Sequence, residues 1–136
     1  MKTPVQEVRS AFRELLGMRV VAQELNRVTV EFPIAAQLMN YAGMLHGGAM
    51  ASVIDMAGCL AGCYSADPER KRVAVTLAFT TAFIGTATDG VVRAVGVKQG
   101  GGRQIYTATV EMFDAAGKVI ATGQGTYRYL PGSEET

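Results

Sequence analysis

The stretch from His46 to Cys63 constrains the fold of this 136-residue chain more than any other part. It opens on a Gly-Gly pair, and between Gly47 and Cys63 its only polar side chains are Ser52 and Asp55. Apolar residues fall on every face of a helix with this sequence, so the pattern predicts a long helix that is buried nearly all round. Other elements must wrap around such a helix, and the carboxylate in its middle needs a partner or a function.

The segments on either side of this helix alternate in the manner of β-strands. The expected strands are 18–25, 28–32, 73–79, 91–98, 104–113 and 118–130. The short turns between them favour antiparallel pairing, because parallel strands need long crossover connections. The sequence therefore predicts an α+β fold in which one twisted antiparallel sheet wraps around a long central helix.

The length of the chain indicates one domain over residues 1–136. An amphipathic N-terminal helix is expected within 1–17, from a cap at Thr3-Pro4 to a stop at Gly17. The polar tail 131–136 is expected to be disordered. In the last strand, Gly123 and Gly125 lie two residues apart on one face and indicate that a bulky group approaches closely there.

Charge and hydropathy exclude two classes of partner. Lys and Arg number 13 against 12 Asp and Glu, with no basic stripe, so nucleic-acid binding is not expected. The apolar run 49–63 is shorter than the roughly 20 residues of a membrane span and carries a central Asp. Its Gly58-x-x-x-Gly62 spacing is therefore interpreted as close packing on a sheet. Cys59 and Cys63 are expected to be reduced, and without an apolar signal segment the expected compartment is the cytoplasm.

Asp55 and the Gly-Gly entrance are candidates for a reaction site. Free N–H groups at the start of a helix suit an oxyanion formed in acyl transfer, although a plain glycine turn has the same sequence. Asp55 is interpreted either as a general base or nucleophile with a raised pKa, or as a structural carboxylate held by neighbouring strands. His46, the only histidine, lies in no cluster with metal-ligand spacing, so no metal site is predicted.

The spacing Asn40-x5-His46-Gly47-Gly48-x6-Asp55 resembles that of the hotdog-fold thioesterases. The most similar branch contains the phenylacetate-degradation and 4-hydroxybenzoyl-CoA thioesterases, and the resemblance extends over most of the chain. It implies hydrolysis of acyl-CoA thioesters to a free acid and CoA. By this resemblance, Asp55 activates water or attacks the carbonyl, the Gly47 N–H polarises the carbonyl oxygen, and Asn40 and His46 support the geometry.

The resemblance also suggests which groups bind substrate. Some members of the family carry a Ser on the strand after the helix; Ala74 stands there in this chain, and Thr76 is the candidate replacement. Gly48, Phe79 and Arg103 complete the expected substrate-binding set. Lys71, Arg72 and Arg103 are otherwise interpreted as solvated surface. The candidates for the acyl pocket are Met39, Tyr41, Met50, Leu60, Phe79 and Phe83. CoA is part of the substrate, no cofactor is expected, and the acyl group stays open among aromatic, short and medium chains.

The separation of Gly47 and Asp55 predicts the assembly. They lie eight residues apart, which is about 12 Å along a helix, so they cannot both reach one carbonyl carbon. If both serve one thioester, they come from different subunits of a homodimer or a dimer of dimers. The alternative function is a non-catalytic acyl-CoA-binding sensor or regulatory module, although no DNA-binding segment is visible. A hotdog dehydratase or hydratase would carry a His-based pattern that is not seen here.

Overall fold

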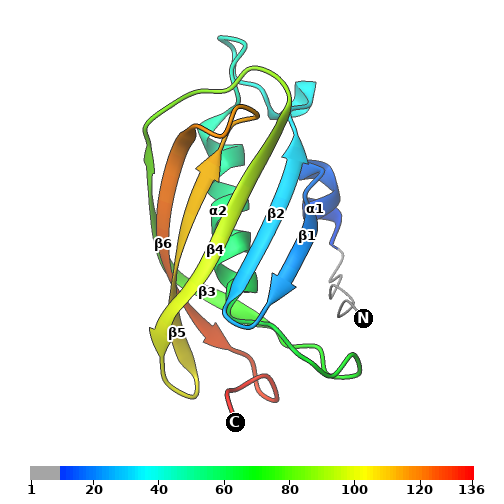
Figure 1. Cartoon of the computed structure of the whole chain (residues 1–136), viewed down its shortest axis with the longest axis vertical. Helices are drawn as coiled ribbons and strands as arrows, with labels where there is room; N and C mark the ends of the chain where they lie inside the picture. Colours follow the sequence, from blue (N-terminus) through cyan, green and yellow to red (C-terminus); the bar gives the residue numbers. More distant parts are fainter. Residues whose placement is uncertain (1–9) are drawn as a thin grey trace.

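The computed structural model describes residues 10–136, in which one antiparallel sheet curves around a long helix (Figure 1). The elements are α1 Ala11–Leu16, β1 Arg19–Glu24, β2 Arg27–Pro33, the 3-10 turn η1 Ala36–Leu38, α2 Gly47–Ala61, β3 Ala74–Phe83, β4 Val91–Gly101, β5 Ile105–Phe113 and β6 Val119–Tyr129. The strand order in the six-stranded sheet is β1-β2-β4-β5-β6-β3. This arrangement confirms the predicted α+β architecture.

The concave face of the sheet packs on α2 through alternate residues of its strands. Phe32, Val92 and Met112 point inward and are fully buried, and on α2 they meet Val53 and Ile54. At Gly123 a Cβ atom would lie 2.3 Å from the Ile54 side chain, so only glycine allows this approach. The close contact predicted from the glycines of the last strand is thereby confirmed.

Both ends of the chain differ from expectation. The described part of the N-terminal helix begins at a Ser10 cap, whose hydroxyl accepts from the Arg13 N–H at 3.1 Å, and ends at Gly17 as predicted. The cap expected at Thr3-Pro4 lies outside the described residues. The expectation of a disordered tail 131–136 is wrong for its central part, because residues 132–135 are hydrogen-bonded to the body of the protein.

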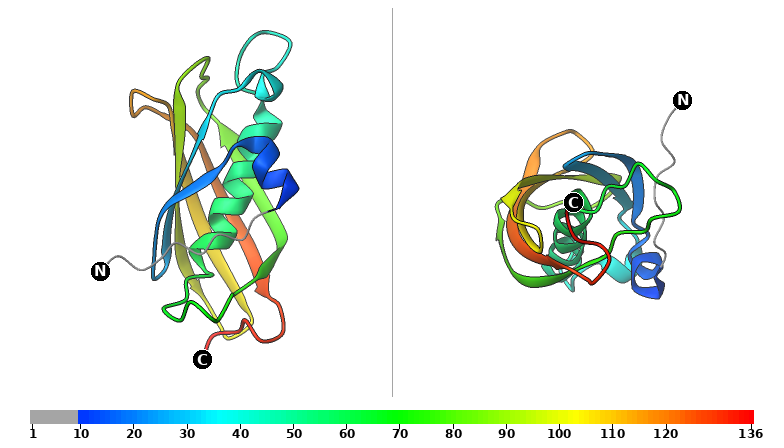
Figure 2. Two further views of the ribbon diagram at one scale, coloured as in Figure 1. Left: turned by 90° about the vertical axis from the view of Figure 1, so that its right-hand side faces the viewer. Right: turned by 90° about the horizontal axis from the view of Figure 1, so that it is seen from below.

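One side of α2 is open, which corrects the prediction of a helix buried nearly all round. β1 and β3 are the two edges of the sheet, and the sheet curves only part of the way around α2 (Figure 2). Between these edges α2 shows a half-buried stripe made of Ser52, Asp55, Met56, Cys59 and Leu60. No helix of residues 10–136 is long and apolar enough to cross a membrane.

Candidate active site

Asp55 lies on the open stripe of α2, where β3 meets its carboxylate. The Thr76 hydroxyl donates a hydrogen bond to Asp55 Oδ1 at 2.6 Å. Partial burial raises the pKa of the Asp55 carboxyl, and the bond from Thr76 opposes that rise. Thr76, the residue expected to replace the family Ser, therefore contacts the candidate catalytic carboxylate. A half-buried carboxylate of raised pKa can act as a general base or as a nucleophile.

The entrance to α2 is organised by His46, which is the N-cap of the helix. Its Nδ1 accepts the Gly48 N–H at 2.8 Å, so the neutral ring carries its proton on Nε2. The Gly47 N–H has no acceptor among residues 10–136. Of the two glycine N–H groups, the one on Gly47 is thus free to polarise a carbonyl oxygen.

Asn40 shapes the loop that leads into this entrance. Its Oδ1 accepts from the N–H groups of Ala42 at 2.9 Å and Met44 at 3.0 Å. Its backbone N–H donates to the Met44 carbonyl at 2.7 Å, which closes the loop. These contacts consume the side-chain oxygen of Asn40 and leave its side-chain N–H groups without a partner among residues 10–136.

An apolar cavity of about 360 Å³ begins at Asp55. One wall is the second half of α2, where Asp55, Met56, Cys59 and Leu60 line it, together with Cys63 just beyond the helix. The facing wall is the segment from Arg72 to Thr76, and Ser10, Arg13 and Met18 complete the lining. Since the lining continues along α2 from Asp55 and reaches Cys63, the cavity extends from the carboxylate to the C-terminal end of the helix. Such a space suits an apolar group attached to the reacting carbonyl.

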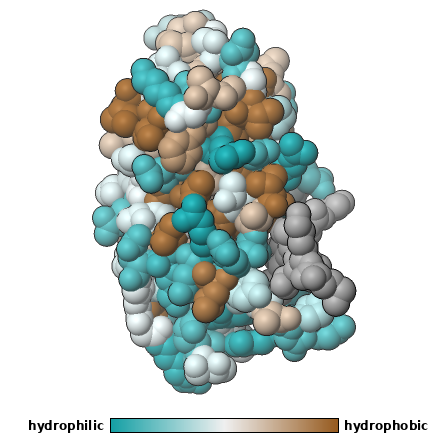
Figure 3. Space-filling model, in the orientation of Figure 1, coloured by the Kyte–Doolittle hydropathy of each residue, from teal (hydrophilic) through white to brown (hydrophobic). Residues whose placement is uncertain are grey.

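A larger hollow of about 700 Å³ lies on the convex face of the sheet and contains none of the candidate residues. Its lining includes Val91, Phe113 and the Glu31–Arg93 ion pair of 3.1 Å. The same face, seen in Figure 3, shows apolar surface gathered in its upper half. The smaller cavity is the better candidate because the Asp55 carboxylate, whose pKa is raised, lines it together with Thr76.

Comparison with known proteins places these residues in a family. Residues 42–121 match the model of the Thioesterase superfamily. The chain belongs to this superfamily. It is 34% identical to the conserved protein PA5202 from Pseudomonas aeruginosa, whose structure aligns with a TM-score of 0.84 over 93% of this chain and 100% of that chain. A variant of the phenylacetic acid degradation protein PaaI from Thermus thermophilus is 26% identical, with a TM-score of 0.74 over 89% of this chain and 100% of the relative.

A further solved structure supports the fold alone. Thioesterase HI1161 from Haemophilus influenzae is 21% identical and aligns with a TM-score of 0.78 over 88% of this chain and 82% of that chain. The family match and these structures together show a hotdog-type thioesterase, as the sequence predicts.

Three tyrosines fix the C-terminal half of α2 in this thioesterase. Their hydroxyls donate to successive carbonyls of the helix: Tyr127 to Asp55 at 3.2 Å, Tyr106 to Cys59 at 2.6 Å and Tyr129 to Gly62 at 2.6 Å. We call Tyr106, Tyr127 and Tyr129 the tyrosine clamp. The Tyr106 ring stacks on the Tyr127 ring with centroids 5.3 Å apart, and it is tilted against the Tyr129 ring with centroids 4.6 Å apart. Sequence reasoning did not assign these residues a role.

The clamp requires glycine on both sides of Tyr127. A Cβ atom on Gly58 would lie 2.2 Å from the Tyr127 hydroxyl, and one on Gly125 would lie 2.3 Å from it. The predicted close packing of the Gly58-x-x-x-Gly62 helix on the sheet is confirmed by this fit. The glycine spacing, read together with alternate tyrosines on the last strand, is the signal that could have revealed the clamp.

The remaining candidate residues of the thioesterase are scattered. Phe79 is partly exposed on β3, and the ring of Phe83 lies beside Gly47. Tyr41 is fully exposed in this chain, and Met50 is buried in the core, so neither lines the cavity. Arg103 lies in the β4–β5 turn, at the end of the molecule opposite the start of α2 (Figure 1).

The described residues offer neither a reactive thiol at Cys59 nor a group of metal ligands. A hydrogen bond with Cys63, followed by burial, raises the pKa of the Cys59 thiol, so Cys59 is a poor nucleophile. Residues 10–136 contain no group of three or more His, Cys, Asp or Glu side chains that could hold a metal ion. The carboxylate of Asp55 is therefore the strongest candidate for the reacting group of the thioesterase.

Proposed function

We propose that this thioesterase hydrolyses acyl-CoA thioesters to a free acid and CoA. The observation that carries the proposal is the Asp55 carboxylate, which receives the Thr76 hydroxyl at 2.6 Å and opens into an apolar cavity. A thioester whose acyl group entered this cavity would present its carbonyl carbon near the carboxylate. The 26% identical relative is named for phenylacetic acid degradation, which makes arylacetyl groups a first choice of acyl group to test.

In the proposed mechanism, Asp55 takes a proton from water while the water oxygen attacks the thioester carbonyl. The Gly47 N–H holds the negative charge that forms on the carbonyl oxygen. Collapse of the tetrahedral intermediate breaks the C–S bond, and the thiolate of CoA leaves with the proton that Asp55 carries. The Thr76 hydroxyl donates to Asp55 Oδ1, so Oδ2 is the oxygen that accepts the proton from water. If Asp55 instead attacks the carbonyl directly, the thiolate of CoA leaves and a mixed anhydride remains. When water then attacks the aspartyl carbon of this anhydride, a single turnover in oxygen-18 water yields unlabelled acid and labelled Asp55.

We propose further that the working unit is a homodimer with shared sites. Gly47 and Asp55 stand about 12 Å apart along α2, so one chain does not offer both groups to one carbonyl. β3 is an unpaired edge strand whose exposed side chains include Val75, Leu77 and Phe79. A second copy related by a two-fold axis would pair this edge, cover the open stripe of α2 and supply the missing Gly47.

Thiol release from a panel of acyl-CoAs tests the reaction. We expect turnover of at least one member, with phenylacetyl-, hexanoyl- and dodecanoyl-CoA as the informative set. Binding of acyl-CoA without thiol release would contradict the enzymatic proposal and favour a non-catalytic acyl-CoA-binding module.

A mixed dimer tests the shared site. Asn40→Ala and Asp55→Ala, once each is shown to be inactive, are co-expressed and their heterodimer is purified. If Asn40 and Gly47 come from one chain and Asp55 from the other, one site in each heterodimer carries both lesions and the other carries none. The purified heterodimer then has roughly half of the wild-type activity, and the unfractionated mixture, in which about half of the dimers are mixed, has roughly a quarter, by the symmetry of the interface. A heterodimer without activity would falsify the cross-subunit arrangement.

A further inference from the structure

We propose that the C-terminal segment Gly132–Glu135, here called the strap, closes the far end of the acyl cavity by holding Arg72 in place. It thereby limits the length of acyl chain that the enzyme accepts. This inference rests on the proposed acyl-CoA hydrolysis and deepens it by assigning a chain-length limit to a segment that lies away from the reacting groups.

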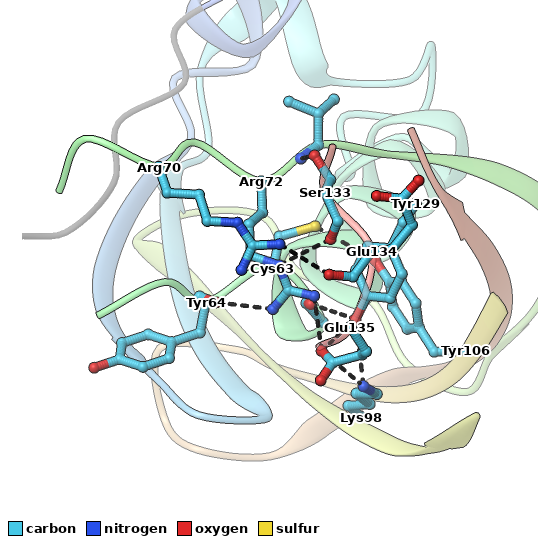
Figure 4. Close-up of polar contacts among 12 residues, drawn as sticks. Cys63, Tyr64, Arg70, Arg72, Lys98, Tyr106, Tyr129, Ser133, Glu134 and Glu135 are labelled. Carbon is cyan, nitrogen blue, oxygen red and sulfur yellow. Dashed lines mark hydrogen bonds and ion pairs between the residues drawn. The ribbon is translucent and has the colours of Figure 1, made fainter. Parts of the chain in front are cut away.

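Arg72 is the residue that ends the cavity. It lies at the end of the lining opposite Asp55 and is only 7% exposed, although the sequence placed it on the solvated surface. Its guanidinium donates to the Tyr64 carbonyl at 3.0 Å, the Ser133 carbonyl at 3.0 Å and Glu135 Oε1 at 2.7 Å (Figure 4). A buried cation keeps its position only while such acceptors surround it, so the acceptors from the strap hold this closure.

The strap is itself bound firmly to the body of the protein. The Ser133 hydroxyl accepts from the Val73 N–H at 2.9 Å, which ties the strap to the start of β3. Glu135 Oε1 also receives the Tyr129 hydroxyl at 3.2 Å and lies 3.4 Å from Lys98 Nζ. The strap thus bridges one wall of the cavity and the tyrosine clamp (Figure 4).

The cavity suits an acyl chain better than the pantetheine arm of CoA. Met56, Leu60 and Val75 supply apolar surface. Among the polar lining groups, Cys59 Sγ donates to the Ala74 carbonyl, and each guanidinium nitrogen of Arg72 already donates to an acceptor. The amides of pantetheine would lose their hydrogen bonds to water here without replacement, at a cost that an alkyl chain does not incur. From Asp55 to Ala61 the cavity follows about 9 Å of helix and then continues to Cys63, which sets the available length.

Two variants open the closed end in different ways. In the first variant the chain ends at Leu130, which removes the strap. In the second, Arg72→Ala removes the guanidinium that the strap holds. For each, kcat/KM is measured with hexanoyl-CoA and dodecanoyl-CoA in the otherwise complete protein. We expect the dodecanoyl-to-hexanoyl ratio to rise at least about tenfold, since one methylene in an apolar pocket is worth a comparable factor.

Glu134→Gln is the matched control. Glu134 lies on the same strap, and its carboxylate accepts the Gly132 N–H at 2.7 Å without contacting Arg72, so the ratio should not change. If both opening variants fail to fold, Glu135→Gln keeps a neutral acceptor for Arg72 and should raise the ratio about twofold through the lost charge.

An unchanged ratio in folded variants overturns the strap proposal. A uniform rise of KM for all chain lengths also overturns it, because it would assign the cavity to the CoA arm. If the wild-type protein hydrolyses none of the acyl-CoAs, the proposed function fails instead, which separates the two failures.

Discussion

The two halves of α2 are held in place by different kinds of contact. The two candidate reacting groups, the Gly47 N–H and the Asp55 carboxylate, lie at the start of the first half and at the boundary between the halves. In the first half, His46 caps the helix and Asn40 closes the preceding loop, so the side-chain hydrogen bonds that fix its start come from residues close in the chain. In the second half, the constraints come from Tyr106, Tyr127 and Tyr129, which lie on β5 and β6. The first half keeps a free N–H at Gly47. In the second half, the carbonyls of Asp55, Cys59 and Gly62 each accept a hydrogen bond from a tyrosine hydroxyl. Asp55 stands at the boundary, with its carbonyl in the clamp and its carboxylate in the open stripe.

The largest expected effect is at that boundary. Asp55→Ala should reduce thioester hydrolysis by at least ~100-fold, as expected for the loss of a base or nucleophile, while folding persists. Steady-state thiol release and circular dichroism check both parts. Ser52→Ala is the matched control, because Ser52 lies on the same stripe and only donates to the Gly48 carbonyl at 2.8 Å. If Asp55→Ala turns over at a near-normal rate, the carboxylate is structural.

Two glycine substitutions, one in each half of α2, should change the free energy of unfolding differently. Gly58→Ala places a Cβ atom against Tyr127, which Gly125 prevents from moving away, so we expect a loss of roughly 1–3 kcal/mol in unfolding free energy. Gly47→Ala places its Cβ atom 3.7 Å from the Phe83 ring, an ordinary contact, so stability should be unchanged or higher. Urea unfolding measures both. Equal losses in the two variants would contradict the division of α2 into two halves.

The locally determined parts of the fold were predictable from the sequence. The strand boundaries agree with expectation except in two strands. β3 continues to Phe83 because its pairing with β6 continues to Ala121, and β4 continues to Gly101, where a turn was expected, because Gly101 pairs with Tyr106. The Gly-Gly pair and the apolar run that follows it predicted the central helix, which ends at Ala61, slightly earlier than expected. The open side of this helix was not predicted, because apolar residues on every face do not distinguish a covering sheet from a covering second copy.

The long-range parts could not be predicted. The polar sequence of the tail is typical of disorder, and its order depends on Arg72, about sixty positions earlier in the chain. The tyrosine clamp likewise depends on the register of β5 and β6 against α2. By contrast, the family resemblance singled out Thr76 as a possible replacement for the family Ser, and its hydroxyl lies 2.6 Å from Asp55 Oδ1.

A smaller effect is expected from single hydroxyls of the clamp. Tyr127→Phe removes the bond to the Asp55 carbonyl and should cost about 0.5–1.5 kcal/mol of unfolding free energy. Tyr129→Phe, which acts at Gly62, should cost a similar amount. Because only Tyr127 touches the residue that carries the carboxylate, Tyr127→Phe should also lower kcat a few-fold with KM unchanged. Equal kcat values in the two variants would show that the clamp stabilises α2 without positioning Asp55.

The smallest effect is a pair of opposite pH dependences of stability. Burial raises the pKa of Asp55 above its ordinary 3.8, so the folded protein binds this proton more tightly than the unfolded chain, and stability is lost as pH rises through the raised pKa. Arg72 lowers the pKa of Glu135 below 4.5, so that its contribution is present above 4.5 and lost as pH falls through the lowered value.

Asp55→Asn should therefore be more stable than the wild type at neutral pH, and Glu135→Gln less stable. Both differences should shrink in acid: the first below about 3.8, where Asp55 is protonated in both states, and the second as Glu135 takes up its proton. Thermal unfolding across this pH range measures both slopes. A wild-type protein that is more stable than Asp55→Asn at neutral pH would mean that contacts such as the one from Thr76 offset the burial of the carboxylate. In that case the Asp55 carboxylate stabilises the fold at the boundary between the two halves of α2.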